Sequence, residues 1–95
     1  MTRPQIITID LGGVRGIEEL HECLGQALGF PDWYGRNWDA FWDAITGLVD
    51  MPEMLELHGW SAFAVTMPKE SVLLSELFVE MNDKYPAWAP KVIYR

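Results

Sequence analysis

Two aspartates, Asp39 and Asp43, stand one helical turn apart in the segment WYGRNWDAFWDAITG (Trp33–Gly47). Paired carboxylates can serve as general acid and base, hold a metal ion, or receive a cation from a partner. Like charges four residues apart cost a helix about 0.2–0.5 kcal/mol, so stability alone does not account for this pair. On one exposed helical turn both carboxylates would share one environment, whereas acid–base catalysis needs two different ones. A solvated surface and a partner-binding surface are the two interpretations left open.

Aromatic residues crowd the same segment and favour the second interpretation. Trp33, Tyr34, Trp38 and Trp42 fall within ten positions. Trp and Tyr dominate binding hot spots because they bury much surface with few rotatable bonds. Aromatic rings around carboxylates also make a good receptor for arginine and lysine. Periodicity places Trp38 on a buried arc and Trp42 at its border with the acidic arc, while Trp33 and Tyr34 precede the helix in a loop.

A short helix must position these groups. Asn37 is a good N-cap and Gly47 a good C′ residue, so the sequence predicts a helix of about ten residues between them. At about 100° per residue, Asp39, Asp43 and Thr46 form one polar arc that ends near Gly47. The opposite, buried arc consists of Trp38, Phe41, Ile45 and Leu48.

Charge and composition limit the partners. The 95 residues include 14 acidic and 7 basic side chains, for a net charge of −7. So negative a surface repels nucleic-acid phosphates and anionic lipid headgroups, and we expect a cationic protein partner. The single cysteine, Cys23, forms no intrachain disulfide, and the chain shows no apolar run of membrane-spanning length and no secretion pattern at its start. We therefore expect a cytoplasmic protein, and a monomer.

Other residues that could do chemistry are isolated. His21 and His58 have no HExxH partner and no cysteine at zinc-ligand spacing, and both are predicted to be ordinary surface histidines. The GGVRG turn after Leu11 lacks the glycine spacing of a dinucleotide site and the Gly-Lys-Ser/Thr of a P-loop. We predict no cofactor, no metal and no catalysis. A small enzyme that uses the acidic pair is kept as a third alternative, which a metal assay would test.

The remaining pattern predicts that residues 1–95 form a single two-layer α/β domain. Strands separated by helices imply right-handed crossovers and a parallel sheet. In the predicted helix Gly16–Leu28, apolar residues such as Ile17, Leu20 and Leu24 recur at helical spacing, and Gly29 closes the helix. The other predicted elements are the strands Gln5–Leu11, Met54–His58 and Lys91–Arg95, and a helix from Pro68 to about Lys84. The spacing in Trp60–Met67 favours a short helix, although AFAVTM also alternates as a strand does.

The segment Tyr34–Asp43, followed by Thr46-Gly47, resembles the barstar family of intracellular inhibitors of secreted bacterial ribonucleases. The match is strong across Leu20–Pro52 and weaker at Glu70–Leu73. The resemblance implies a three-stranded parallel sheet packed with about four helices, and it favours a helix over a strand at Trp60–Met67.

The resemblance also implies a function and a set of contacts. In that family an acidic helix and its preceding loop plug the positively charged cleft of the ribonuclease. Carried over by position, Asp43 is the central anchor and Asp39 a second acidic contact. A further acidic contact comes from the last helix, where Glu80 is the best candidate and Glu76 the substitute. The predicted partner-binding residues are Trp33, Tyr34, Asn37, Asp39, Trp42, Asp43, Thr46, Gly47 and Glu80.

Several positions depart from the family pattern. Arg36 stands where the family has an acid, Leu48 where it has a tryptophan, Ala44 where it has a cysteine, and Lys84 at a further acidic contact. These changes keep the anchor and alter the rim, where partner choice is often decided. We therefore predict a one-to-one inhibitor of a small basic ribonuclease. The alternative is a barstar-like binding module for a non-nuclease toxin or a regulatory partner.

Overall fold

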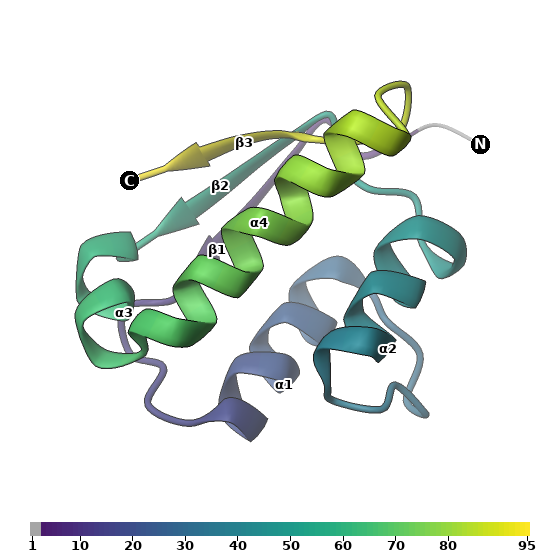
Figure 1. Ribbon diagram of the computed structural model, residues 1–95. Coiled ribbons are helices and arrows are strands. Elements are labelled where there is room, and N and C mark those ends of the chain that lie inside the picture. Colours follow the sequence, from purple (N-terminus) through teal and green to yellow (C-terminus); the bar gives the residue numbers. More distant parts are fainter. Residues whose placement is uncertain (1–2) are drawn as a thin grey trace.

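The computed structural model describes residues 3–95, in which a parallel sheet is packed with helices (Figure 1). The strands and α-helices follow the predicted order, with small differences at their ends, but a π-helical turn replaces the second half of the helix predicted between Asn37 and Gly47. In chain order the elements are β1 (Ile6–Asp10), α1 (Ile17–Leu28), α2 (Trp38–Asp43), the π-helical turn η1 (Ala44–Leu48), β2 (Met54–His58), α3 (Trp60–Thr66), α4 (Pro68–Lys84) and β3 (Lys91–Tyr94).

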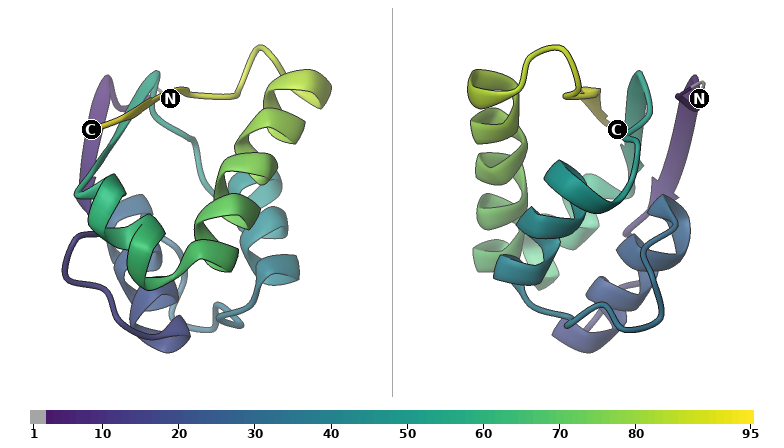
Figure 2. Two further views of the ribbon diagram at one scale, coloured as in Figure 1. Left: turned by 60° about the vertical axis from the view of Figure 1, so that its left-hand side comes forward. Right: turned by 90° about the vertical axis from the view of Figure 1, so that its right-hand side faces the viewer.

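The sheet has three parallel strands in the order β1-β2-β3, as predicted. Side chains alternate between its two faces. Ile7, Leu55 and Val92 are in register on the face that meets the helices. Both views in Figure 2 show the helices gathered on one side of the strands, which gives the two layers of the predicted α/β domain.

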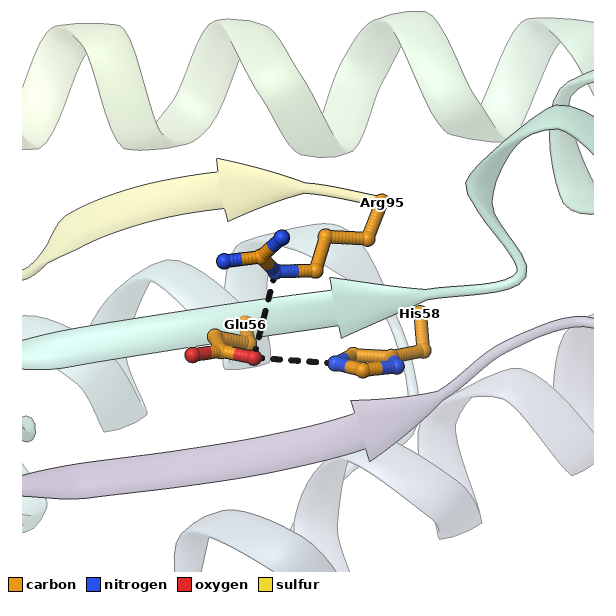
Figure 3. A network of polar contacts seen from close by, with 3 residues as sticks. All are labelled: Glu56, His58 and Arg95. Atoms are coloured by element: carbon orange, nitrogen blue, oxygen red, sulfur yellow. Dashed lines mark hydrogen bonds and ion pairs between the residues drawn. The ribbon is translucent and has the colours of Figure 1, made fainter.

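The opposite face of the sheet is open and carries a polar network on β2 and the chain after β3 (Figure 3). Glu56 Oε1 lies 2.9 Å from His58 Nε2 and 3.3 Å from Arg95 Nε. The hydrogen bond with His58 lowers the pKa of Glu56, and the Arg95 charge adds to the effect. His58 is therefore a partly exposed structural histidine, consistent with the surface position predicted for it.

The apolar core lies between the sheet and the helices, and Phe41 of α2 is at its centre. The ring of Phe41 is fully buried and makes edge-on contacts with Phe30, Trp38 and Phe78, at centroid distances of 5.8, 5.5 and 6.0 Å. The contact with Phe78 joins α2 to α4. Aromatic pairs in this geometry stabilise beyond the area that they bury.

The predicted apolar face of the first helix is partly wrong. Leu20 and Leu24 are buried, whereas Ile17 is 45% exposed. Ile17 is the first residue of α1, one turn before Leu20, which is the first buried residue of the helix. Gly29 closes α1 as predicted, in the left-handed conformation (φ 76°) that glycine adopts without steric cost.

We expect Phe41→Ala to lower the free energy of unfolding by about 3–5 kcal/mol, because it leaves a cavity where three aromatic rings meet. Urea unfolding followed by tryptophan fluorescence measures the change. The control is Val65→Ala on the exposed surface of α3, which should change stability by no more than about 0.5 kcal/mol. Equal effects of the two substitutions would contradict a core organised around Phe41.

Candidate functional site

A groove between α2 and α4 brings together three of the predicted acidic contacts. Its lining consists of Trp38, Asp39, Trp42 and Asp43 from α2 and of Leu77 and Glu80 from α4, around a volume of about 400 Å³. We call it the acidic groove. Asp39 and Asp43 are exposed and form no ion pair within residues 3–95. Their charges are therefore available to a partner.

The structure distinguishes the two candidates from the last helix. Glu80 lines the acidic groove together with Asp39 and Asp43. Glu76 lies one turn earlier on α4 and is absent from the lining of this groove; it lines a neighbouring hollow that Glu80 also borders. Glu80 is therefore the acidic residue of α4 that lines the groove with the acidic pair.

Asn37 sets the start of α2, as predicted. Its Oδ1 accepts a hydrogen bond of 2.7 Å from the N–H of Ala40, and its amide donates one of 3.1 Å to the carbonyl of Gly35. Both ends of the side-chain amide are thus used inside the molecule. Asn37 holds the helix that presents the carboxylates.

The helix does not end at Gly47, so the prediction of a C′ residue there is wrong. After Asp43 the chain widens into the π-helical turn η1, in which the N–H of Val49 donates to the carbonyl of Ala44, five residues back, at 3.2 Å. Gly47 lies inside this turn without a positive φ. Leu48, predicted on the buried arc, is the last residue of this turn and is 46% exposed, so that prediction is also wrong. The Thr46 hydroxyl donates to the carbonyl of Trp42 at 2.6 Å and so competes with the backbone for that oxygen, which accompanies the widening.

Thr46 and Gly47 line a second hollow, of about 270 Å³, at the far end of the helix, together with Arg3 and Trp88. The guanidinium of Arg3 is bound to backbone carbonyls, including those of Met51 and Pro52, both at 2.8 Å. No sequence pattern singled out Arg3, since its partners lie more than forty-five residues away. The structure thus places Thr46 and Gly47 beside the acidic groove rather than in it.

The loop before α2 exposes one predicted aromatic and anchors the other. Trp33 is 72% exposed. Tyr34 is half-buried: its ring packs edge-on against Phe30 at 4.7 Å, and its hydroxyl shares a hydrogen bond of 2.5 Å with Nδ1 of His21. Burial raises the pKa of Tyr34 above its usual range. The anchor at Tyr34 leaves the adjacent Trp33 facing solvent.

His21 is buried with 0% exposure, so its prediction as a surface histidine is wrong. Burial lowers its pKa, and the nearby charge of Glu70 opposes that shift. Its ring meets Trp38 edge-on at 4.7 Å. Within residues 3–95, His21 Nε2 and Trp38 Nε1 are buried without a hydrogen-bond partner. The spacing of His21 to Leu24 and Leu28 was a signal of burial, because i, i+3 and i+7 share one helix face.

Arg36 puts a positive charge in the loop and is itself held in place. Its Nη1 lies 3.1 Å from Oε1 of Glu22 on α1. Its backbone is left-handed (φ 53°), which costs a non-glycine residue about 1 kcal/mol or more. The ion pair and the adjacent Asn37 cap hold the loop in this strained conformation.

We expect the stability of the protein to fall as the pH drops below about 6.5, because the unfolded chain then protonates His21 more readily than the folded one. Above that pH both states hold the histidine neutral, and its effect vanishes. His21→Gln should remove this part of the loss, which is at most about 1.4 kcal/mol per pH unit. Urea unfolding at pH 7.5, 6.5 and 5.5 measures it.

The matched control is His58→Gln, which leaves His21 in place and should keep the steep loss of the parent. Parallel stability curves for the parent and His21→Gln would show that His21 does not titrate differently on folding.

Comparison with known proteins identifies a family model and a curated protein that the chain resembles. The family model described as Barstar (barnase inhibitor) matches residues 5–92. A Bacillus subtilis (strain 168) protein named "Putative ribonuclease inhibitor YrdF" is 53% identical over 54 residues, which are 57% of this chain and 59% of that protein. The chain thus spans about 59% of the length of this curated relative.

The structure also bears on metal binding and membrane insertion by residues 3–95. They contain no group of three or more histidine, cysteine, aspartate or glutamate side chains that could hold a metal ion. None of their helices has the length and apolar character needed to cross a membrane.

Since the family model covers nearly all of the chain, and the parallel sheet and the acidic α2 are both present, the chain belongs to the barstar family.

Proposed function

We propose that this protein inhibits a small basic ribonuclease by binding it one-to-one and covering its active site with the acidic groove and the loop before α2. Membership of the barstar family and the name of the Bacillus subtilis relative support this role. The observation that carries it is the convergence of Asp39, Asp43 and Glu80, from two helices, on one groove beside Trp42.

The chemistry of the groove suits such a partner. A ribonuclease binds the phosphates of its substrate with cationic side chains, and carboxylate oxygens can take the place of phosphate oxygens as acceptors for them. Trp42 adds a ring face on which a guanidinium can lie. The net charge of −7 attracts a basic protein over a distance and speeds encounter.

The predicted residues have three roles: some contact the partner, some hold the helix and the loop in place, and some form the edge of the contact surface. Asp43 is the central anchor, with Asp39 and Glu80 as further acidic contacts. Trp33 reaches the partner from the loop, and Trp42 forms part of the groove wall. Asn37 and Tyr34 act by holding the helix and the loop in place, while Thr46 and Gly47 form the edge of the contact surface.

We expect the purified protein to abolish RNA cleavage by at least one small basic microbial ribonuclease, with barnase the first to test. Titration of the enzyme against a fluorogenic RNA should reach full inhibition at a one-to-one ratio. Undiminished cleavage across a broad panel of such enzymes, at excess inhibitor, would contradict the proposal. It would favour a barstar-like module for a non-nuclease toxin or a regulatory partner.

Asp43→Ala should separate binding from stability. Asp43 is exposed at the end of α2 and makes no ion pair within the described chain, so we expect an unchanged or slightly raised melting temperature. Binding to the inhibited ribonuclease should weaken by at least about 2 kcal/mol, because desolvated cations of the partner lose their counter-charge. Thermal melts and calorimetric affinities measure both effects.

Glu18→Ala on α1 is the control, since it removes the same charge from an exposed position away from the acidic groove. Its affinity should stay within about threefold of the parent, as expected for a rim or remote charge. If Asp43→Ala bound as well as Glu18→Ala, the site assignment would be wrong.

A further inference from the structure

One cation of the chain itself already lies against the acidic groove. Lys84, the last residue of α4, places its Nζ 3.2 Å from Oε1 of Glu80 and 5.7 Å from the ring centroid of Trp42. Trp42 belongs to α2 and Glu80 to α4, so the ammonium contacts both walls of the groove.

The other basic side chains lie elsewhere. Residues 3–95 include all seven of them. Arg3 is bound to backbone carbonyls, Arg36 to Glu22 and Arg95 to Glu56. In the described chain, Lys84 is the basic residue for which contacts with groove residues are seen.

We infer that Lys84 is a specificity-determining residue, which competes from within the chain with the partner's cation for Trp42 and Glu80. The inference rests on the proposed function, because it names a second ligand for the same groove. The partner's group that displaces Lys84 is a guanidinium: its planar fork stacks on a ring and binds a carboxylate through two hydrogen bonds, which an ammonium cannot do.

The contacts of Lys84 are weak enough for a strongly binding partner to displace it, so Lys84 selects among partners and does not prevent binding. Its side chain is 58% exposed and that of Glu80 is 47% exposed. An exposed ion pair or an exposed cation–π contact each shifts an equilibrium by about two- to fivefold. An arginine-rich partner overcomes such a penalty, whereas a partner that offers isolated lysines gains little over the internal ammonium.

Two possible roles of Lys84, competition with the partner's cation and positioning of Trp42 and Glu80, predict opposite changes in binding affinity when Lys84 is removed. If Lys84 competes, its removal frees Trp42 and Glu80 and strengthens cation binding. If instead it holds these two side chains in the orientation that the partner needs, its removal weakens binding. Lys84→Gln therefore tests the inference through the direction of the change.

Lys69→Gln is the matched control. Lys69 lies on the same helix at its opposite end, is exposed, and its loss changes the net charge by the same amount. Any tightening caused only by a more negative protein appears in both variants. Lys84→Arg is a second control, since it keeps a cation on Trp42 and Glu80 and should not gain affinity as Lys84→Gln does.

The first arm uses hexaarginine peptide as the probe and follows the Trp42 indole signal by NMR, assigned with Trp42→Phe. We expect Lys84→Gln to bind the peptide about three- to tenfold more tightly than the parent, and Lys69→Gln less than about twofold more tightly. Equal affinities of the two variants, or weaker binding by Lys84→Gln, would overturn the inference. Thermal melts check that both variants fold.

The second arm measures the binding of the parent, Lys84→Gln and Lys69→Gln to barnase. It also tests Lys84→Gln in a protein that already carries Glu80→Gln. The gain from Lys84→Gln should shrink in the Glu80→Gln background, because one of the two contacts is already lost. If the protein inhibits no ribonuclease but Lys84→Gln still binds hexaarginine more tightly, the proposed function is refuted and the competition of Lys84 with a bound cation is not. Inhibition of barnase without any gain would refute the competition alone.

Discussion

The packing of Phe41 against Phe78 is the interaction on which the site depends. These rings, 6.0 Å apart, hold α2 beside α4 and so bring residues nearly forty positions apart in the sequence to one surface. The carboxylates of Asp39, Asp43 and Glu80 repel one another, and nothing in their own chemistry would gather them. Burial of the apolar faces beneath them supplies the free energy that keeps them together.

The clustered carboxylates lower the stability of the free protein, and in the proposed complex they strengthen binding to a partner. Like charges at close range destabilise the free protein slightly, because solvent screens exposed charges. In the proposed complex, a cationic partner removes the repulsion and adds charge-assisted hydrogen bonds at the same moment. Lys84 relieves part of the repulsion within the free protein, which gives its position on Trp42 and Glu80 both a stabilising and a competing effect.

The loop before α2 is held by a separate set of contacts. Tyr34 is anchored to buried His21, and the Arg36 backbone is held in a strained conformation beside the Asn37 cap. Loops on rigid scaffolds carry binding residues well when their own backbone is fixed, because less conformational freedom is lost on binding. Trp33 is presented by this fixed loop, so its exposed ring can contact a partner without reordering the chain.

Local patterns predicted most elements of this protein, but the family resemblance favoured the helix over a strand at α3, and the π-helical turn η1 was not predicted. The β-branched run before Leu11, the period of two at Met54–His58 and the apolar face of α4 each identify their element, because propensity and periodicity act over a few neighbouring residues. The Asn37 cap is local in the same sense and was correctly predicted. The acidic pair on α2, with its aromatic neighbours, also pointed to partner binding without any knowledge of the fold.

Long-range packing decided the remainder. The burial of His21 depends on Tyr34 and Trp38, which contact its ring from other segments, and Ile17 is exposed at the start of α1, one turn before the first buried residue of that helix. Gly47 was predicted to end the helix, but the chain continues through it in the π-helical turn η1, in which the Thr46 hydroxyl donates to the carbonyl of Trp42. The sequence determined which residues carry charge and which elements present them. Only the tertiary structure decided that Glu80, rather than Glu76, lines the groove with the acidic pair and that Lys84 contacts Glu80 and Trp42, since neighbours in space from distant segments are set by how the helices pack.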